Sequence, residues 1–219
     1  MAFNKAGEET RKKIYWAAKK LFYVNGFQHT SCMQIAESAE ANVALISYYY
    51  KNKLNLGLEI CNEFTNDIRI AVIEKMIEAG YEYEPIIGLG VEYRAFKKFQ
   101  IENPSYNRFI KDLCNENALL LSDHYVGVNL KFLEEKYDIR LSETDEKIAH
   151  YCITSIYNGI INVMDKGYID ETEFPAERLV DIILKILDFE KAERDNILEQ
   201  SKEIFDKIDI SMSRYFRVK

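Results

Sequence analysis

Residues 30–53 read TSCMQIAESAEANVALISYYYKNK and carry the signals of two short helices joined by a tight turn. Ser31, followed three residues later by Gln34, fits the capping box that starts a first helix. Asn42 has a side chain favoured at the N-cap of the second helix. Residues 39–41 leave room only for a turn between them. The pattern is typical of a helix-turn-helix, whose second helix can enter the DNA major groove.

The residues before this stretch predict a third helix. Apolar side chains recur at helical spacing over residues 10–25, and Asn25-Gly26 is a typical helix stop. The three helices would form a small head, and a core of this size is marginal alone, so we expect the head to dock on the helices that follow. The expected core of the head is Ile14, Ala18, Leu21, Phe22, Phe27, Ile35, Ile46 and Tyr50.

The distribution of charge separates this head from the rest of the chain. The 219 residues carry a formal net charge of −7, which by itself argues against binding to nucleic acid. Residues 1–53, however, hold eight Lys and Arg against four Glu, a net +4, so the remaining 166 residues carry −11. A basic head on an acidic body is the distribution expected when the head meets phosphates.

The body predicts helices only, because no strand-like alternation, internal repeat or low-complexity tract occurs in it. We therefore expect an all-α fold, with the three-helix head followed by a bundle of about six or seven helices. The helices expected in the body cover about 54–79, 87–101, 106–121, 122–137, 142–166, 175–189 and 190–207, and a short basic tail follows at 213–219.

Composition also bears on where the chain resides. No run of 18 apolar residues occurs, so we expect no membrane-spanning helix. The first residues lack an apolar signal region, which favours a cytoplasmic protein. The four cysteines are scattered and lack zinc-site spacing, so we expect reduced thiols in a cytosolic core.

A longer pattern of residue types extends over residues 10–56. It reads T-R-x-x-I-x-x-A-A-x-x-L-F-x-x-N-G-F-x-x-T-S over 10–31, I-A-x-x-A over 35–39, and I-x-Y-Y-Y-x-x-K-x-x-L over 46–56. This pattern resembles the N-terminal domain of the tetracycline-repressor (TetR) family of transcriptional regulators. The resemblance implies a helix-turn-helix DNA-binding domain at 1–53 and a helical ligand-binding and dimerisation domain at 54–219.

The resemblance also implies which residues meet DNA. The start of the second short helix would face base edges, and hydroxyls and a lysine around it would reach phosphates. The apolar front of that helix can contact thymine methyl groups but cannot make bidentate bonds to guanine, so we expect an operator rich in A·T pairs. The expected DNA contacts are Thr30, Ser31, Asn42, Val43, Ala44, Leu45, Ser47, Tyr48, Tyr49 and Lys53.

Two residues depart from the family pattern. Glu40 occupies the turn position where the family usually has glycine, and a non-glycine residue with positive φ costs about 1 kcal/mol there. We expect the fold to absorb this cost or the turn to adjust slightly. Ser47 stands where the family often has tyrosine, which keeps a hydroxyl but shortens its reach to a phosphate.

Two partners besides DNA are expected. One head reads only a half-site, so a palindromic operator calls for a homodimer. The last two long helices of such a protein would carry the contact, and apolar stripes run along 148–163 and 179–187. Ordinary packing within one chain is the alternative for these stripes.

The second partner is a small-molecule effector. Aromatic residues are frequent in the body, and a cavity among them would bind an apolar or amphipathic ligand, although core packing is the alternative for each. A cationic aromatic ligand held by cation–π contacts and a fatty or acyl ligand both stay open. The expected ligand-binding residues are Tyr93, Phe96, Phe109, Leu113, Tyr125 and Tyr157.

No catalytic residue, metal site or cofactor is expected. Ser122-Asp123-His124 suggests a triad, but adjacent residues on a helix do not converge, and fingerprints such as GxSxG or a P-loop do not occur. The sequence therefore predicts a dimeric transcriptional regulator that is not an enzyme, most simply a repressor released from its operator by a ligand. The alternatives are a ligand-independent DNA-binding regulator and, from another class, a helical scaffold or enzyme.

Overall fold

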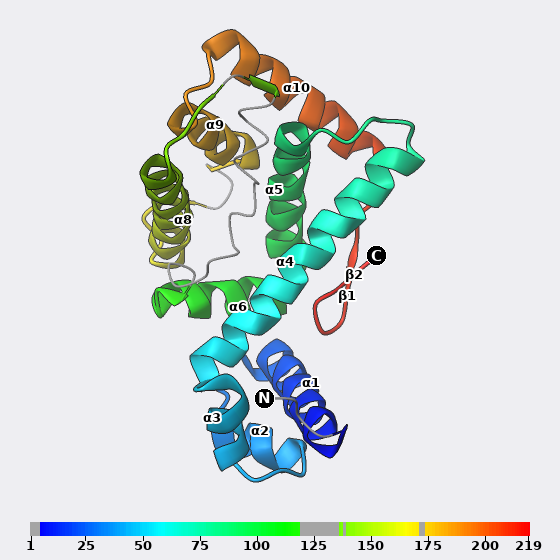
Figure 1. Ribbon diagram of the computed structural model, residues 1–219, viewed down its shortest axis with the longest axis vertical. Coiled ribbons are helices and arrows are strands. Elements are labelled where there is room, and N and C mark those ends of the chain that lie inside the picture. The colour runs from blue at the N-terminus through cyan, green and yellow to red at the C-terminus, as the bar shows by residue number, and fades with distance from the viewer. Residues whose placement is uncertain (1–4, 119–135, 138, 171–173) are drawn as a thin grey trace.

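The computed structural model describes residues 5–118, 136–137, 139–170 and 174–219. Most of the described residues lie in helices and no sheet forms a core among them, which confirms the expected all-α fold. Three helices form the head at one end of the molecule (Figure 1): α1 (Lys5–Asn25), α2 (Cys32–Ser38) and α3 (Ala44–Tyr50). The expected helix at 122–137 lies almost wholly outside the described residues.

A long helix leads from the head into the body. This helix, α4, runs diagonally across the view in Figure 1 and ends where a short connection leads back to α5, which stands in the middle of the body. The body consists of α4 (Lys53–Glu78), α5 (Pro85–Glu102), α6 (Pro104–Asn115), α8 (Glu143–Asp165), α9 (Ala176–Ile186) and α10 (Lys191–Lys207).

The local signals of the head act as the sequence predicts. Ser31 Oγ accepts from the backbone N–H of Gln34, and the Gln34 side chain accepts from the N–H of Ser31, which completes the capping box. The expected core side chains are buried, with Leu21 half-buried at its edge. Helix α1 begins at Lys5, earlier than the expected start near Thr10.

Glu40 adopts the left-handed conformation that its position requires. Its φ is 51°, and the N–H groups of Glu40 and Ala41 donate to the carbonyls of Glu37 and Ala36. These two bonds are the pairing of a Schellman motif, in which the residue after the C-cap is usually glycine. The fold therefore absorbs the strain at Glu40 and keeps the turn.

Replacing Glu40 by glycine should raise the free energy of unfolding by about 0.5–1 kcal/mol, because glycine adopts this conformation without strain. Urea denaturation of the two proteins measures the change. The matched control is Glu37→Gly, an exposed position inside α2, which should lower the free energy by about 1 kcal/mol. A loss of stability in both variants would contradict strain at Glu40.

Helix α5 lies at the centre of the body, where it contacts α4, α6, α9 and α10. Helix α10 approaches it closely at Gly90, where an added Cβ would lie 2.5 Å from Ser201 Oγ. Arg94, which is buried, donates to the carbonyl of Gly90 (2.8 Å), to Ser201 Oγ (3.0 Å) and to the carbonyl of Leu198 (3.1 Å). This network ties α5 to α10 across a contact that only a glycine permits.

Two features differ from the sequence-based expectation. Lys19, a charged residue of a type that is ordinarily exposed, is 1% exposed and pairs with Glu63 of α4 at 2.6 Å. The tail, expected to be a short basic extension, forms a two-stranded antiparallel hairpin from β1 (Met212–Ser213) and β2 (Arg217–Val218). Both differences arise from tertiary contacts with α4. Within the described residues, none of the helices has the length and apolar character needed to cross a membrane.

Candidate DNA-binding surface and ligand cavity

Helix α3 presents an exposed front on the surface of the head. Ile46 and Tyr50, on its inner face, are buried in the core of the head. The opposite face is open, and Tyr48 is 62% exposed and Val43 39% exposed. The exposed front consists of Asn42, Val43, Ala44, Ser47 and Tyr48, all of them expected DNA contacts.

Asn42 lies just before α3 and bonds the first residue of this helix. Its Oδ1 accepts from the N–H of Ala44 at 2.9 Å, whereas Val43 occupies the N-cap position and makes no side-chain cap bond, so the expected N-cap differs by one residue. Ser31 is the N-cap of α2, and both Ser31 and Asn42 are exposed. The two side chains therefore support the starts of both helices and also lie on the surface of the helix-turn-helix.

Two residues expected on the DNA face lie partly within the head instead. Leu45 and Tyr49 are half-buried and pack against the hydrophobic core. Adjacent residues on a helix point about 100° apart, so Leu45 turns toward the core when its neighbour Ala44 faces solvent. The surface available to DNA on α3 is therefore limited to the five exposed residues. A change at Leu45 would disturb packing as well as any contact with a base.

Thr30 and Lys53 are engaged with the backbone of the head. Thr30 is 1% exposed, and its hydroxyl donates to the carbonyl of Gly26 at 2.7 Å. Lys53 Nζ donates to the carbonyls of Phe27 and Thr30, each at 2.9 Å, and lies 4.3 Å from the centre of the Phe27 ring. These interactions close the loop before α2, and a phosphate would have to compete with them, so this geometry does not favour the two expected contacts.

The head is anchored to α4 by polar contacts that the sequence did not reveal. Tyr50 donates its hydroxyl to the carbonyl of Arg11 at 2.8 Å, and Arg11 reaches Glu59 of α4 at 2.6 Å. Burial raises the pKa of Tyr50 above its ordinary value, so this hydroxyl stays protonated as a donor. Together with the Lys19–Glu63 pair, these contacts hold α1 and α3 of the head against α4.

Comparison with known proteins identifies the head. The sequence profile described as "Bacterial regulatory proteins, tetR family" matches residues 14–60. Those residues run from α1 through α3 into the start of α4 and include the whole exposed front. Residues 14–60 are therefore similar to the N-terminal domain of the TetR family.

The match to a curated protein sequence also covers about a quarter of the chain. The probable HTH-type transcriptional regulator YttP of Bacillus subtilis (strain 168) is 47% identical over 55 residues. That alignment covers 25% of this chain and 27% of YttP, so the two proteins share about a quarter of their lengths.

Solved structures extend the likeness in fold to most of the chain. RolR in complex with resorcinol superimposes with a TM-score of 0.60 at 14% identity, over 89% of this chain and 95% of that one. RolR without ligand gives 0.54 at 13% identity, over 86% and 96%. At these identities the likeness concerns the fold alone.

A small apolar cavity lies in the body between α5, α8 and the start of α9. Its volume is about 30 Å³. Three expected ligand-binding residues line it together, namely Tyr93, Phe96 and Tyr157. The sequence missed the remaining lining, which includes Gln100, whose side-chain amide lies 3.3 Å from the Tyr157 hydroxyl. Helical periodicity on α5 could have found Gln100, which lies one turn beyond Phe96.

The other expected ligand-binding residues are not at this cavity. Phe109 packs between Phe22 and Phe216, with ring centres 5.9 and 4.8 Å away, at the junction of head and body. Leu113 lies on the same helix, α6, beside Gly57 at the start of α4. Both are core residues because the face of α6 that bears them packs toward the head. Tyr125 lies outside the described residues.

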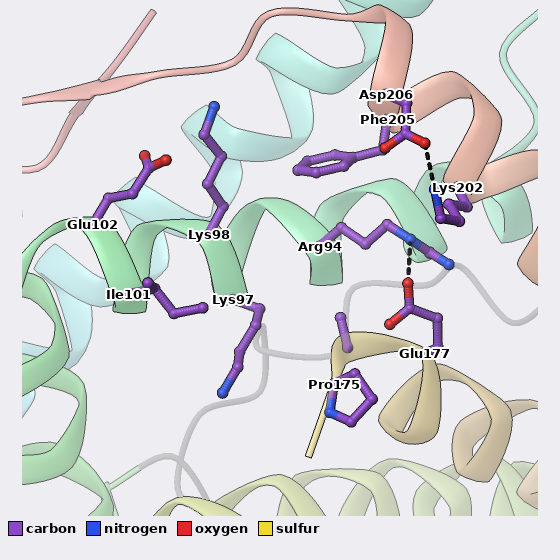
Figure 2. Close-up of a pocket in the computed structure, with 11 residues that line it drawn as sticks. Arg94, Lys97, Lys98, Ile101, Glu102, Pro175, Glu177, Lys202, Phe205 and Asp206 are labelled. Atoms are coloured by element: carbon purple, nitrogen blue, oxygen red, sulfur yellow. Dashed lines mark hydrogen bonds and ion pairs between the residues drawn. The ribbon is translucent and has the colours of Figure 1, made fainter. Parts of the chain in front are cut away.

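A wider groove adjoins the cavity and shares Lys97 and Ala176 with it. Figure 2 shows this groove between α5, the start of α9 and α10. Its volume is about 430 Å³, and its lining mixes Ile101, Phe205 and Pro175 with charged side chains. Arg94 and Glu177 form an ion pair at 3.2 Å along one side of the groove. Cavity and groove together offer an apolar interior with a charged rim.

One face of α8 is exposed and partly apolar. Ile148 is 55% exposed and Tyr151 54% exposed, and Cys152, Ser155 and Gly159 follow on the same side. A Cβ built on Gly159 would meet no atom within 4 Å, which shows how open this face is. Within the described part of the chain, no group of three His, Cys, Asp or Glu residues is arranged to hold a metal ion.

Proposed function

We propose that this protein is a DNA-binding transcriptional regulator, acting as a repressor that a small ligand releases from a palindromic operator. The observation that carries the proposal is the exposed front of α3 on a TetR-family head. The family places this helix in the major groove, and the basic charge of residues 1–53 favours the approach to phosphates. The head at 1–53 would bind DNA, and 54–219 would bind ligand and partner.

The exposed face of α8 supports the dimer. Ile148 and Tyr151 would be buried by the same face of a second copy, and Ser155 and Gly159 would let the two helices approach closely. An isologous contact of this kind gives twofold symmetry, which the two half-sites of a palindromic operator match. Affinity for DNA then depends on holding two heads at one spacing.

Thiol reactivity tests the dimer. Cys152 lies on the exposed face of α8, so a thiol reagent should modify it slowly in concentrated protein and at least about fivefold faster after dilution or in Gly159→Arg, which blocks the contact. Cys32 in the head is the internal control and should react at one rate throughout. Burial raises the pKa of Cys61 to about 12 and that of Cys114 well above its usual range, so both should react only on unfolding. If the reaction rate of Cys152 changed neither on dilution nor in Gly159→Arg, this face of α8 would be excluded as the dimer contact.

The cavity and groove support ligand control. The groove has the volume of ordinary ligand sites, whereas the enclosed cavity is far smaller, so an effector would enter from the groove and enlarge the cavity. Tyr93 and Phe96 would contact an apolar portion, and the charged rim a polar one. Displacement of α5 would shift α4 and change the separation of the heads. Such coupling is reciprocal, so operator DNA should weaken effector binding by the same factor.

Two measurements test the proposal as a whole. A gel-shift assay with DNA from upstream of its own gene should show salt-sensitive binding that requires the dimer. A thermal-shift panel of small phenols, beginning with resorcinol because RolR has the same fold and binds it, should then find compounds that stabilise the protein and release the DNA. DNA binding that no ligand affects would support a ligand-independent regulator instead. Absence of any DNA binding would favour a scaffold and overturn the proposal.

A further inference from the structure

The chain does not end at α10 but continues to the junction between body and head. Ile210, just after α10, is 1% exposed, and its carbonyl accepts from Lys98 Nζ of α5 at 2.9 Å. From there Ser211 and Lys219 exchange backbone hydrogen bonds of 3.1 and 2.9 Å and close the C-terminal hairpin, residues 211–219. Figure 1 shows this hairpin beside α4, on the side toward α1.

Phe216, at the tip of the C-terminal hairpin, is fully buried among three helices. Its ring centre lies 5.3 Å from that of Tyr23 in α1, 6.0 Å from Phe64 in α4, and 4.8 Å from Phe109 in α6. Edge and tilted ring contacts at these distances are favourable beyond the area they bury. One side chain from the C-terminus therefore joins the head to two helices of the body.

The backbone at the tip of the hairpin is strained in a way that this burial explains. Tyr215 and Phe216 have φ angles of 62° and 53°, so two of the three loop residues between Ser213 and Arg217 adopt the left-handed conformation that Gly or Asn usually occupies. Bulky residues persist there only when surrounding contacts compensate for the strain. Phe216 supplies those contacts, so the turn is built to present an aromatic ring to the junction.

The hairpin also contacts the head directly. The Tyr215 ring lies 5.4 Å from Tyr23, and the Arg217 guanidinium lies 5.5 Å from the centre of the Trp16 ring on α1. Tyr23 and Trp16 both belong to the head, and they lie two helical turns apart along α1. The hairpin thus contacts α1 at more than one position, which restrains its direction as well as its distance from the body.

We propose that the C-terminal hairpin sets the orientation of the DNA-binding head on the body, with Phe216 as its positioning residue. This proposal rests on the proposed function. Lys98 both lines the groove in Figure 2 and donates to the carbonyl of Ile210 at the start of the hairpin. The hairpin therefore gives the groove a second connection to the head, in addition to the one along α4. The connection is formed by residues 211–219 of the same chain, and these residues need not contact DNA.

The test uses full-length Phe216→Ala and a duplex that the wild-type protein selects from a random library. Freed heads sample more separations, so the variant should bind the selected duplex roughly fivefold more weakly. Insertion of two base pairs between half-sites should cost the wild type roughly tenfold and the variant less than about threefold. Hydrogen exchange in residues 15–25 should be faster in the variant, even without DNA. Phe216→Leu, which keeps an apolar anchor, should restore most of the spacing preference.

Phe189→Ala is the matched control, because Phe189 is equally aromatic, 3% exposed, and packs against Tyr137 in the body away from the head. It should lower stability without changing the spacing preference or the exchange of residues 15–25. Equal spacing profiles for Phe216→Ala and wild type, tighter binding by the variant, or the same changes in Phe189→Ala would each overturn the proposal. Failure of the proposed function is a different result, in which the wild type selects no DNA, and the exchange measurement still tests the hairpin.

Discussion

Gly90→Val should lower the free energy of unfolding by about 3 kcal/mol, a large fraction of the stability of an ordinary domain. The first added carbon alone would lie 2.5 Å from Ser201 Oγ and 2.6 Å from Ser201 Cβ. Neither helix can yield without cost, because Arg94 bonds both the Gly90 carbonyl and the Ser201 hydroxyl. Separation of α5 from α10 would leave this buried guanidinium short of acceptors, which adds to the overpacking.

Urea denaturation measures the loss, and a double-mutant cycle assigns its cause. Gly90→Ala introduces the same close contact with less volume and should cost about 1–2 kcal/mol. Ser201→Gly removes both atoms in the way, so the double variant should be more stable than the sum of the two single changes by at least about 1 kcal/mol. Strict additivity would show that the packing of α5 against α10 does not determine the cost at Gly90.

The head was predictable from sequence because its signals are local. The capping box at Ser31 and Gln34, the stop at Asn25-Gly26 and the apolar spacing of α1 each act within one helical turn or its neighbour. The left-handed residue at Glu40 was located by the resemblance to the family pattern, in which this turn position is usually glycine. Where neighbouring residues determine a structure, one sequence is enough to predict it.

Residues whose surroundings come from distant segments were not predictable. Lys19 has the residue type of a surface position, yet its side chain is buried. Its ammonium donates to the carboxylate of Glu63, which lies 44 positions away in the chain. The hairpin strands are two residues each, too short to show alternation, and they exist because Phe216 finds a site among three helices. Periodicity contains no information about such partners.

The ligand cavity shows the same division. Tyr93, Phe96 and Tyr157 line it, whereas Phe109, equally aromatic and equally buried, belongs to the junction core. The residue types are alike, and the difference is the direction in which each helix faces. The direction in which each aromatic side chain points depends on how α5, α6 and α8 pack against one another. Amino-acid composition contains no information about this packing.

Ala44→Asp should weaken binding to the selected operator by a factor on the order of 100, the largest effect expected from any single change on the head. Ala44 is exposed at the first position of α3, where an aspartate suits the helix N-terminus, so the fold should be kept. In the major groove, however, the new carboxylate faces phosphates and the oxygen and nitrogen acceptors of the bases. Fluorescence anisotropy with labelled duplex measures the loss.

Two controls separate charge at this position from other causes. Ala192→Asp makes the same change at an exposed site in the first turn of α10, remote from the head, and should leave affinity within about twofold. Ala44→Asn has nearly the shape of Ala44→Asp without its charge, so it should keep most of the affinity while shifting base preference toward adenine at one position. Salt screens this repulsion, so the loss of DNA affinity in Ala44→Asp should shrink between 50 and 300 mM salt. Over this range the screening length falls from roughly 14 Å to roughly 6 Å. A deficit that does not change with salt, or an equal loss in Ala192→Asp, would remove α3 from the DNA interface.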